Sequence, residues 1–268
     1  MELTIGFSPC PNDTFIFDAL VNGKIDTEGI HFKPLLEDVQ TLNRWAIEEK
    51  LDISKISYGV LPLVLQNYSL LNSGGALGKG VGPLLISKQP INNLDEAIVE
   101  MTVAIPGENT TAHLLYSFAF PDAKKKIFLV FNEIENAVLD EQVNAGVIIH
   151  ENRFTYQDKG LIKLMDLGKY WEEKTGSPIP LGGIVMKKSF EQKLQHQVDK
   201  LIRKSLENSF SNYPNISTYV SSHSQEMSEE VMRKHIELYV NNFSLDLGIA
   251  GKAAVAIFLK AYDEITSI

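Results

Sequence analysis

Short apolar runs alternate with longer stretches of helical period along most of the chain. The runs are rich in Val, Ile and Phe, and in the stretches between them apolar residues tend to recur every three or four positions. This alternation is typical of parallel sheets covered by helices and predicts an α/β fold. The expected strands are 3–7, 30–36, 53–57, 84–87, 101–105, 127–131, 147–149 and 182–186. The expected helices are 13–21, 39–49, 61–65, 110–118, 134–143 and several segments beyond residue 190, the last of which is Ala-rich (251–265).

Two strands flanked by proline and glycine could carry the chain from one group of elements to another and back. One lies near residues 82–90 and the other near residues 178–187. Crossings at these points predict a discontinuous lobe I, residues 1–90 plus 181–268, and an inserted lobe II, residues 91–180. A central cleft between two such lobes is a common place for a small-molecule site.

Charge and cysteine content narrow the classes of partner. The chain of 268 residues carries 25 Lys and Arg against 34 Asp and Glu, a formal charge of −9. We therefore expect neither nucleic acid nor an anionic membrane surface as a partner. Cys10 is the only cysteine, which excludes an intramolecular disulfide and a cysteine-based metal cluster. The sequence shows neither a basic, apolar leader nor a run of ~20 apolar residues, and we expect a cytoplasmic location.

The densest local signal is a Pro-rich polar segment, Ser8-Pro9-Cys10-Pro11-Asn12-Asp13-Thr14-Phe15, between the first strand and the first helix. The prolines stiffen this loop, and Asn12, Asp13 or Thr14 could cap the helix. It could form part of a binding site, because loops at the carboxyl ends of strands carry sites in α/β folds, or it could be only a stiff helix cap. Cys10 could be a nucleophile at a helix start, but an inert, small apolar residue is the favoured interpretation.

Two further strand-to-helix junctions carry hydroxyl groups. At the first, Thr110 or Thr111 could cap a helix, and the other could join backbone N–H groups in binding an anion, which predicts a carboxylate site. An ordinary threonine cap is the alternative. At the second, Lys55-Ile56-Ser57, the backbone and the Ser57 hydroxyl could reach the same cleft. Lys55 itself is expected to be a solvated edge residue unless the ligand is an anion.

His150 differs from the other five histidines. It directly follows the apolar run 145–149, at the carboxyl end of a predicted strand, and it is the best candidate for a general base. A neighbouring carboxylate such as Glu151 could tune its pKa, and a hydrogen-bonded core histidine is the alternative interpretation. His113 is expected to pack against the threonine cap. Surface positions are expected for the remaining four, His31, His196, His223 and His235.

Several common catalytic motifs do not occur in the sequence. It contains no phosphate-binding loop, no Gly-x-Gly-x-x-Gly after a strand, no His-Glu-x-x-His and no Gly-x-Ser-x-Gly. Nucleotide binding, zinc hydrolysis and serine-hydrolase chemistry therefore lack support. The Gly-rich segment 74–80 is predicted to be a flexible loop beside the cleft.

Four of these segments together carry a resemblance to a known family. The segments 8–17, Lys55-Ile56-Ser57, Pro106-Gly107 with Thr110-Thr111-Ala112, and 145–151 with 153–156 occur in the order found in 1,4-dihydroxy-6-naphthoate synthases, and the chain resembles that family over nearly its whole length. Asn152 stands where the family pattern leads us to expect a small residue such as glycine. The resemblance implies a two-lobed fold like that of type 2 periplasmic binding proteins. It also implies a carbon–carbon lyase of the futalosine route to menaquinone, acting on cyclic dehypoxanthinylfutalosine without a cofactor or metal. By similarity, His150 is the proton acceptor. The implied substrate contacts are Lys55, Ile56, Ser57, Thr110 and Thr111.

Two other functions compete with this one. A chorismate dehydratase of the same pathway and fold would use a different first loop. A cytoplasmic solute-binding protein for a small carboxylate would have the fold without the chemistry. In all three cases the partner is a small molecule that carries a carboxylate, and the oligomeric state stays open.

Overall fold

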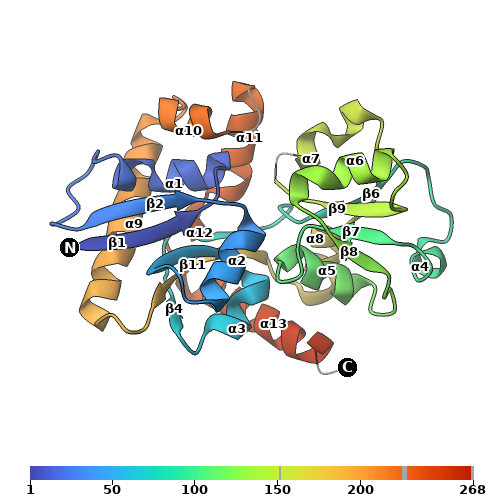
Figure 1. Ribbon diagram of the computed structural model, residues 1–268, viewed down its shortest axis with the longest axis horizontal. Coiled ribbons are helices and arrows are strands. Elements are labelled where there is room, and N and C mark those ends of the chain that lie inside the picture. The colour runs from blue at the N-terminus through green and yellow to red at the C-terminus, as the bar shows by residue number, and fades with distance from the viewer. Residues whose placement is uncertain (151, 225–227, 267–268) are drawn as a thin grey trace.

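The computed structural model describes residues 1–150, 152–224 and 228–266 and contains two mixed β-sheets, each packed with helices (Figure 1). The first sheet consists of β1 (Glu2–Phe7), β2 (His31–Leu36), β3 (Ile53–Ser57), β4 (Tyr68–Leu70), β5 (Ala76–Gly78) and β11 (Ile179–Lys187). The second consists of β6 (Leu84–Ser87), β7 (Val103–Ile105), β8 (Lys126–Phe128), β9 (Ala145–Ile148) and β10 (Ile162–Asp166).

Helices connect and cover the strands of both sheets. Those of the first half are α1 (Pro11–Val21), α2 (Val39–Ile47), α3 (Leu61–Val64), α4 (Leu94–Ala97), α5 (Thr111–Ala119) and α6 (Ile134–Leu139). Those of the second half are α7 (Asn152–Thr155), α8 (Leu167–Thr175), α9 (Gln192–Asn212), α10 (Thr218–His223), α11 (Glu229–Tyr239), α12 (Asn242–Leu245) and α13 (Gly248–Thr266). Short 3₁₀ turns are η1 (Tyr58–Val60), η2 (Phe131–Glu133) and η3 (Tyr156–Lys159). None of the helices in the described ranges is both long and apolar enough to cross a bilayer.

In each sheet one strand runs antiparallel to all the others, β11 in the first sheet and β6 in the second. The first sheet has the order β2-β1-β3-β11-β4, with β5 also paired to β11; β1 runs parallel to β2 and β3, and β11 runs antiparallel to β3. The second has the order β10-β6-β9-β7-β8, in which β7, β8 and β9 are parallel and β6 pairs antiparallel with both β9 and β10. The predicted α/β fold is correct, but the expectation of parallel sheets is wrong for β6 and β11, the strands at the two crossings.

Sheet membership bears on one of the predicted lobe boundaries. The strand β6 pairs with β9 and β10, so it belongs to the second sheet, although the division at residue 90 assigned it to lobe I. The next strand of the first sheet along the chain is β11, which begins at Ile179. The division into lobes otherwise stays a prediction.

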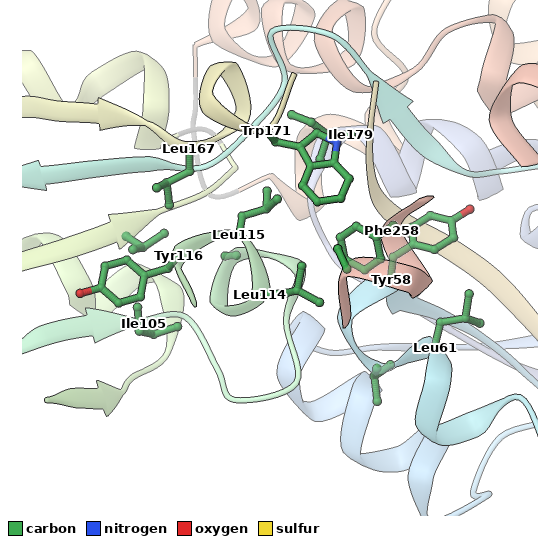
Figure 2. Packing of buried hydrophobic residues seen from close by; sticks show 14 of the residues in the cluster. Tyr58, Leu61, Ile105, Leu114, Leu115, Tyr116, Leu167, Trp171, Ile179 and Phe258 are labelled. Carbon is green, nitrogen blue, oxygen red and sulfur yellow. The ribbon is translucent and has the colours of Figure 1, made fainter. Parts of the chain in front are cut away.

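A continuous apolar cluster joins the two sheets. It contains Ile56 from β3 of the first sheet and Tyr58 from the turn η1 that follows β3. It also contains Ile105 from the second sheet and Phe258 from α13. The ring of Phe258 lies 6.3 Å from that of Tyr58 and 5.7 Å from that of Trp171 in α8, centroid to centroid. Figure 2 shows these rings between Leu61 on one side and Leu115 on the other. Burial of this apolar surface stabilises the arrangement of the two sheets around any site between them.

The structure also differs from the predicted elements in their detail. The short strands β4, β5 and β10 were not predicted, and the run 127–131 forms only the short edge strand β8 and the turn η2. Ile127, Phe128 and Val130 are exposed, which shows that this apolar run is not a buried strand. The Gly-rich segment 74–80 is not a flexible loop throughout, because Ala76 to Gly78 are buried in β5 and pair with β11.

Candidate functional site

All the predicted site residues line one cavity between the two sheets. Its walls come from the first loop and α1, from α2, from the end of β3, from the start of α5 and from the residues after β9. The lining residues are Ser8, Asn12, Asp13, Val39, Leu42, Lys55, Ile56, Ser57, Ala76, Val81, Pro83, Thr110, Thr111, Ala112, Ile149, His150, Leu181, Gly182 and Tyr239. The cavity is therefore built from segments as far apart in the chain as residues 8 and 239.

One wall of the cavity holds a buried ion pair between Lys55 and Asp13. The Lys55 Nζ lies 3.1 Å from Asp13 Oδ1, and the two side chains are only 6% and 4% exposed. Lys55 also donates to the Gly74 carbonyl (2.8 Å), and Asp13 Oδ2 accepts from the Ser8 hydroxyl (2.8 Å). The expectation of a solvated Lys55 is wrong because a carboxylate 42 positions earlier in the chain balances its charge inside the protein.

Asn12 offers a hydrogen-bond acceptor in the same wall. It is 6% exposed, and its Nδ2 donates to Asp13 Oδ1 (2.8 Å). If the amide were reversed, its oxygen would face the carboxylate oxygen of Asp13 and repel it. The nitrogen therefore faces Asp13, and Oδ1 is the polar atom of the amide that is left to bind another group. Among the described residues Oδ1 has no hydrogen-bond partner. The loop is thus more than a cap. The helix that follows it begins at Pro11 rather than at Asp13, because proline suits the first helical position.

The end of β3 is held by a buried asparagine from α2. The Ser57 N–H donates to Asn43 Oδ1 (2.8 Å), and Asn43 Nδ2 donates to Ser57 Oγ (3.1 Å) and to the Asn109 carbonyl (2.8 Å). Asn43 is 0% exposed. It links the first sheet to the loop before α5, and this residue was missed in the sequence. Its position in the sequence would have indicated its burial, since residues 39, 43 and 46 share the apolar face of α2.

Both threonine hydroxyls at the start of α5 are used within the protein. Thr110 is the N-cap: its Oγ1 accepts from the His113 N–H (3.2 Å) and donates to the Gly107 carbonyl (2.8 Å). Thr111 Oγ1 donates to the Leu181 carbonyl (2.8 Å) and accepts from the Gly59 N–H (3.3 Å), so it joins α5 to the first sheet. The first backbone N–H groups of α5 can still bind an anion. They have no hydrogen-bond partner within the helix, because no helical carbonyl lies four residues before them.

The close approach of α5 to the first sheet depends on a glycine. A Cβ at Gly59 would lie 2.5 Å from the Thr110 carbonyl carbon and 2.8 Å from the Thr111 nitrogen. Backbone atoms cannot yield to such a contact, so glycine is required where the two sheets meet.

His150 lies half-buried just after β9 with its backbone in the left-handed region, at a φ of +56°. This conformation is uncommon for a residue with a side chain, and it turns the chain sharply beside the cavity. The imidazole lies between two other rings: its centroid is 4.9 Å from that of Phe131 and 6.1 Å from that of His235. His150 therefore has contacts from both halves of the molecule. Glu151, the suggested carboxylate neighbour, lies outside the described residues.

His235 is not a surface residue, as was expected, but is 0% exposed in α11. Its ring lies 4.7 Å from that of Tyr239, which lines the cavity. Burial, followed by the positive charge of His150 when protonated, holds the pKa of His235 well below its usual value. The stripe Met232, His235, Ile236 and Tyr239 follows helical spacing and would have indicated this burial, although charged residues surround it in the sequence.

The depressed pKa of His235 predicts a loss of stability in mild acid. In the unfolded chain this imidazole takes up a proton near pH 6.5, whereas in the folded protein it resists protonation. Stability is therefore full above pH ~7 and falls as the pH drops from ~7 toward 5, by at most about 1.4 kcal/mol per pH unit for one proton. A His235→Phe variant should show a smaller fall in melting temperature over this range. An equal fall in both proteins would contradict this assignment.

The structure also places Cys10 and the histidines not yet described. Cys10 is buried at the N-cap of α1 and does not line the cavity, which agrees with an inert thiol. The backbone N–H of His113 donates to the Thr110 cap, but its ring Nδ1 is bonded to the Glu108 carbonyl (2.7 Å), so the packing of this side chain against the cap stays a prediction. His31 and His196 are exposed, and His223 is half-buried at the end of α10.

Comparison with known proteins identifies the relatives of this chain. Residues 3–264 match a family model described as menaquinone biosynthesis. The 1,4-dihydroxy-6-naphthoate synthase of Thermus thermophilus is 43% identical over 254 residues, which cover 95% of this chain and 91% of that protein. The enzyme of the same name from Streptomyces coelicolor is 41% identical over 262 residues, 94% and 90% of the two chains.

Solved structures define the fold. A protein of Archaeoglobus fulgidus superposes with a TM-score of 0.93 at 29% identity and covers 100% of this chain and 98% of its own. The periplasmic aliphatic sulphonate binding protein SsuA of Escherichia coli superposes with a TM-score of 0.69 at 11% identity over 99% and 87% of the two chains, a likeness of fold alone. The predicted resemblance to periplasmic binding proteins in fold is thus confirmed. With the match of nearly the full chain to enzymes of one name, the protein belongs to the 1,4-dihydroxy-6-naphthoate synthase family of menaquinone biosynthesis.

Proposed function

We propose that this protein is a carbon–carbon lyase that converts cyclic dehypoxanthinylfutalosine into 1,4-dihydroxy-6-naphthoate, with His150 as the general base in an interlobe cleft. One observation carries the proposal: His150, the 55–57 segment and the start of α5 line the same cavity. A proton acceptor and anion-binding groups therefore face one bound molecule. We infer no requirement for a cofactor, and we place the reaction in the cytoplasm.

His150 would begin the reaction by taking the proton of a substrate hydroxyl. As the carbonyl forms at that carbon, the neighbouring carbon–carbon bond breaks, and its electron pair passes to the ring carbon beside the ring ketone, which becomes an enolate. The sugar-derived fragment leaves with the new carbonyl, the protonated His150 returns its proton to the enolate oxygen, and the ring tautomerises to the aromatic naphthoate. The left-handed backbone at His150 and the flanking ring of Phe131 support this role, because they hold the imidazole at the cavity.

The substrate carboxylate would bind at the start of α5. The first N–H groups of a helix attract anions, and the nine residues of α5 supply a macrodipole of that sign. Lys55 would contribute a positive charge to the same cavity, although Asp13 largely balances it. The protein as a whole carries a charge of −9, so a local anion site of this kind has to be built from backbone groups and buried side chains.

Turnover of the proposed substrate by the purified protein tests this function. We expect 1,4-dihydroxy-6-naphthoate to form, detected by its absorbance and by mass, without added metal or cofactor. Chorismate should remain unchanged in a parallel assay. Tight binding of either compound without any product would favour a solute-binding protein, and consumption of chorismate would favour the dehydratase.

A further inference from the structure

The backbone of His150 has a conformation that the surrounding structure has to enforce. Its φ of +56° lies in the left-handed region, which a residue with a side chain adopts rarely. Such a conformation persists only where the chain is fixed on both sides of it. On the N-terminal side the strand β9 fixes the chain, because Ile148 pairs with Leu84 of β6. The support on the C-terminal side has to come from contacts of the residues that follow His150.

A buried glutamate of α6 supplies such a contact. Glu135 Oε2 accepts a hydrogen bond of 2.6 Å from Nδ2 of Asn152, the first residue of α7, two positions after His150. The same oxygen accepts from Lys159 Nζ at 2.6 Å. Within the described ranges the other carboxylate oxygen has no hydrogen-bond partner, so Glu135 acts through these two bonds. Glu135 is 1% and Asn152 9% exposed, so water competes little for the bond between them.

The segment that carries Glu135 also contacts the imidazole of His150. Phe131 begins the turn η2, which leads directly into α6, and its ring lies 4.9 Å from that of His150, centroid to centroid. Phe131 therefore packs against the ring of His150, while Glu135 holds the chain just after it. One short segment thus restrains both the side chain and the backbone of the proposed general base.

The helix α6 is itself fixed against the strand that ends before His150. Ile134 of α6 belongs to the same buried apolar cluster as Ile148 of β9. A Cβ at Gly146 of β9 would lie 2.4 Å from Ile134 Cγ2, so the helix and the strand are in close contact. Because densely packed apolar groups resist displacement, α6 is a rigid base for the carboxylate of Glu135.

We propose that Glu135 is a positioning residue that, through its hydrogen bond to Asn152, holds the chain after His150 and so keeps the imidazole directed at the substrate hydroxyl. This inference rests on the proposed function for the role of His150 as general base. Glu135 is not one of the described residues that line the cavity, so it acts on the reaction through the placement of His150.

Turnover of the cyclic substrate by Glu135 variants tests this role. Glu135→Leu has a side chain of similar size that accepts no hydrogen bond, and it should lower kcat by about 10- to 100-fold, the effect of a displacement of about 1 Å at a reacting group. Glu135→Gln keeps an oxygen that can accept from Asn152, and its kcat should lie within about threefold of the unaltered value. Asn152→Ala breaks the same bond, so its effect should not multiply that of Glu135→Leu. The dissociation constant of 1,4-dihydroxy-6-naphthoate should change by no more than about threefold in each variant, because the binding groups stay in place.

Lys159 provides the matched control, because it is the other partner of Glu135 Oε2. Lys159→Met removes the ion pair and leaves the bond to Asn152 in place. The Glu135 side chain is only 2% exposed, so the loss of its cation should lower the melting temperature. Its kcat should nevertheless change by no more than about twofold, which separates a loss of stability from a loss of positioning.

Crystal structures of the variants measure the placement of His150 independently of activity. In Glu135→Leu the imidazole should be displaced by about 1 Å or more from its place against Phe131, whereas in Glu135→Gln and Lys159→Met it should stay there. If Glu135→Leu does not fold, Asn152→Ala, which leaves the ion pair with Lys159 intact, replaces it.

An imidazole that keeps its place when the bond between Glu135 and Asn152 is broken would overturn the inference, whatever the turnover. Multiplied effects in the double variant, or a loss of kcat in Lys159→Met as large as that in Glu135→Leu, would also overturn it. The proposed function fails separately, because a displaced imidazole with undiminished kcat would support the positioning by Glu135 and contradict only the role of His150 as general base.

Discussion

Replacing His150 by glutamine should lower turnover of the cyclic substrate by about 10²- to 10⁴-fold, the usual contribution of one general base. Glutamine keeps a polar side chain of similar reach but cannot take up a proton near neutral pH. The ring of His150 is flanked by Phe131 and His235, so the surrounding packing supports a side chain at this place in the variant. Steady-state kinetics with the cyclic substrate measure the effect.

Measuring product binding shows whether the His150→Gln variant has lost only its general base or also its binding site. The dissociation constant of 1,4-dihydroxy-6-naphthoate should change by only a few-fold in His150→Gln, since the proposed carboxylate contacts lie at the start of α5 and on β3. His196→Gln, at an exposed position of α9, is the control and should turn over like the unaltered enzyme. Undiminished turnover in His150→Gln would remove this residue from the role.

The largest stability effect is expected from breaking the buried ion pair in the cavity wall. Lys55→Met leaves the Asp13 carboxylate 4% exposed without its cation, and an uncompensated buried charge costs about 3–5 kcal/mol. For a chain of this size each kcal/mol lowers the melting temperature by roughly 2–4 °C, so a fall of roughly 6–20 °C is expected. Thermal unfolding followed by circular dichroism measures it.

Removing both charges should restore part of this loss. The double variant Lys55→Met with Asp13→Asn has no buried charge to compensate and should melt above Lys55→Met alone. The surface pair Lys169 and Glu173, with side chains 74% and 63% exposed, supplies the control, and Lys169→Met should change stability by less than about 0.5 kcal/mol. A Lys55→Met protein as stable as this control would show that the buried pair contributes little.

The parts of the fold that were predicted from sequence are those with a strong local pattern. The strands near residues 3–7 and 53–57 are short apolar runs, and the helix from Val39 has an Asp38 cap that accepts from the Gln40 and Thr41 N–H groups. Their local preferences agree with their place in the core. The strands β4, β5 and β10 lacked such a pattern, because each is short or largely exposed on one side and depends on pairing with a distant strand.

The candidate site could be predicted where a strand-to-helix junction marked it, but its internal contacts could not. Position after a strand located His150 and the segments near residues 55 and 110 correctly in one cavity. The burial of Lys55 depends on Asp13, which lies far away in the sequence, and that of His235 depends on the packing of α11 against distant elements such as α1 and β5. Such pairings follow from topology rather than from local pattern. The hydrogen bonds of the Thr111 hydroxyl to Leu181 and Gly59, which join α5 to the first sheet, likewise depend on residues far away in the sequence.

A crystal structure of the His150→Gln variant with the cyclic substrate tests the central claim most directly, because the substrate should bind without being consumed. We expect the substrate carboxylate at the first N–H groups of α5 and beside Ser57, and the hydroxyl that loses its proton within about 3 Å of the side chain at position 150. A substrate bound outside this cavity, or one whose reacting hydroxyl lies beyond the reach of position 150 while its carboxylate occupies the α5 start, would contradict the account.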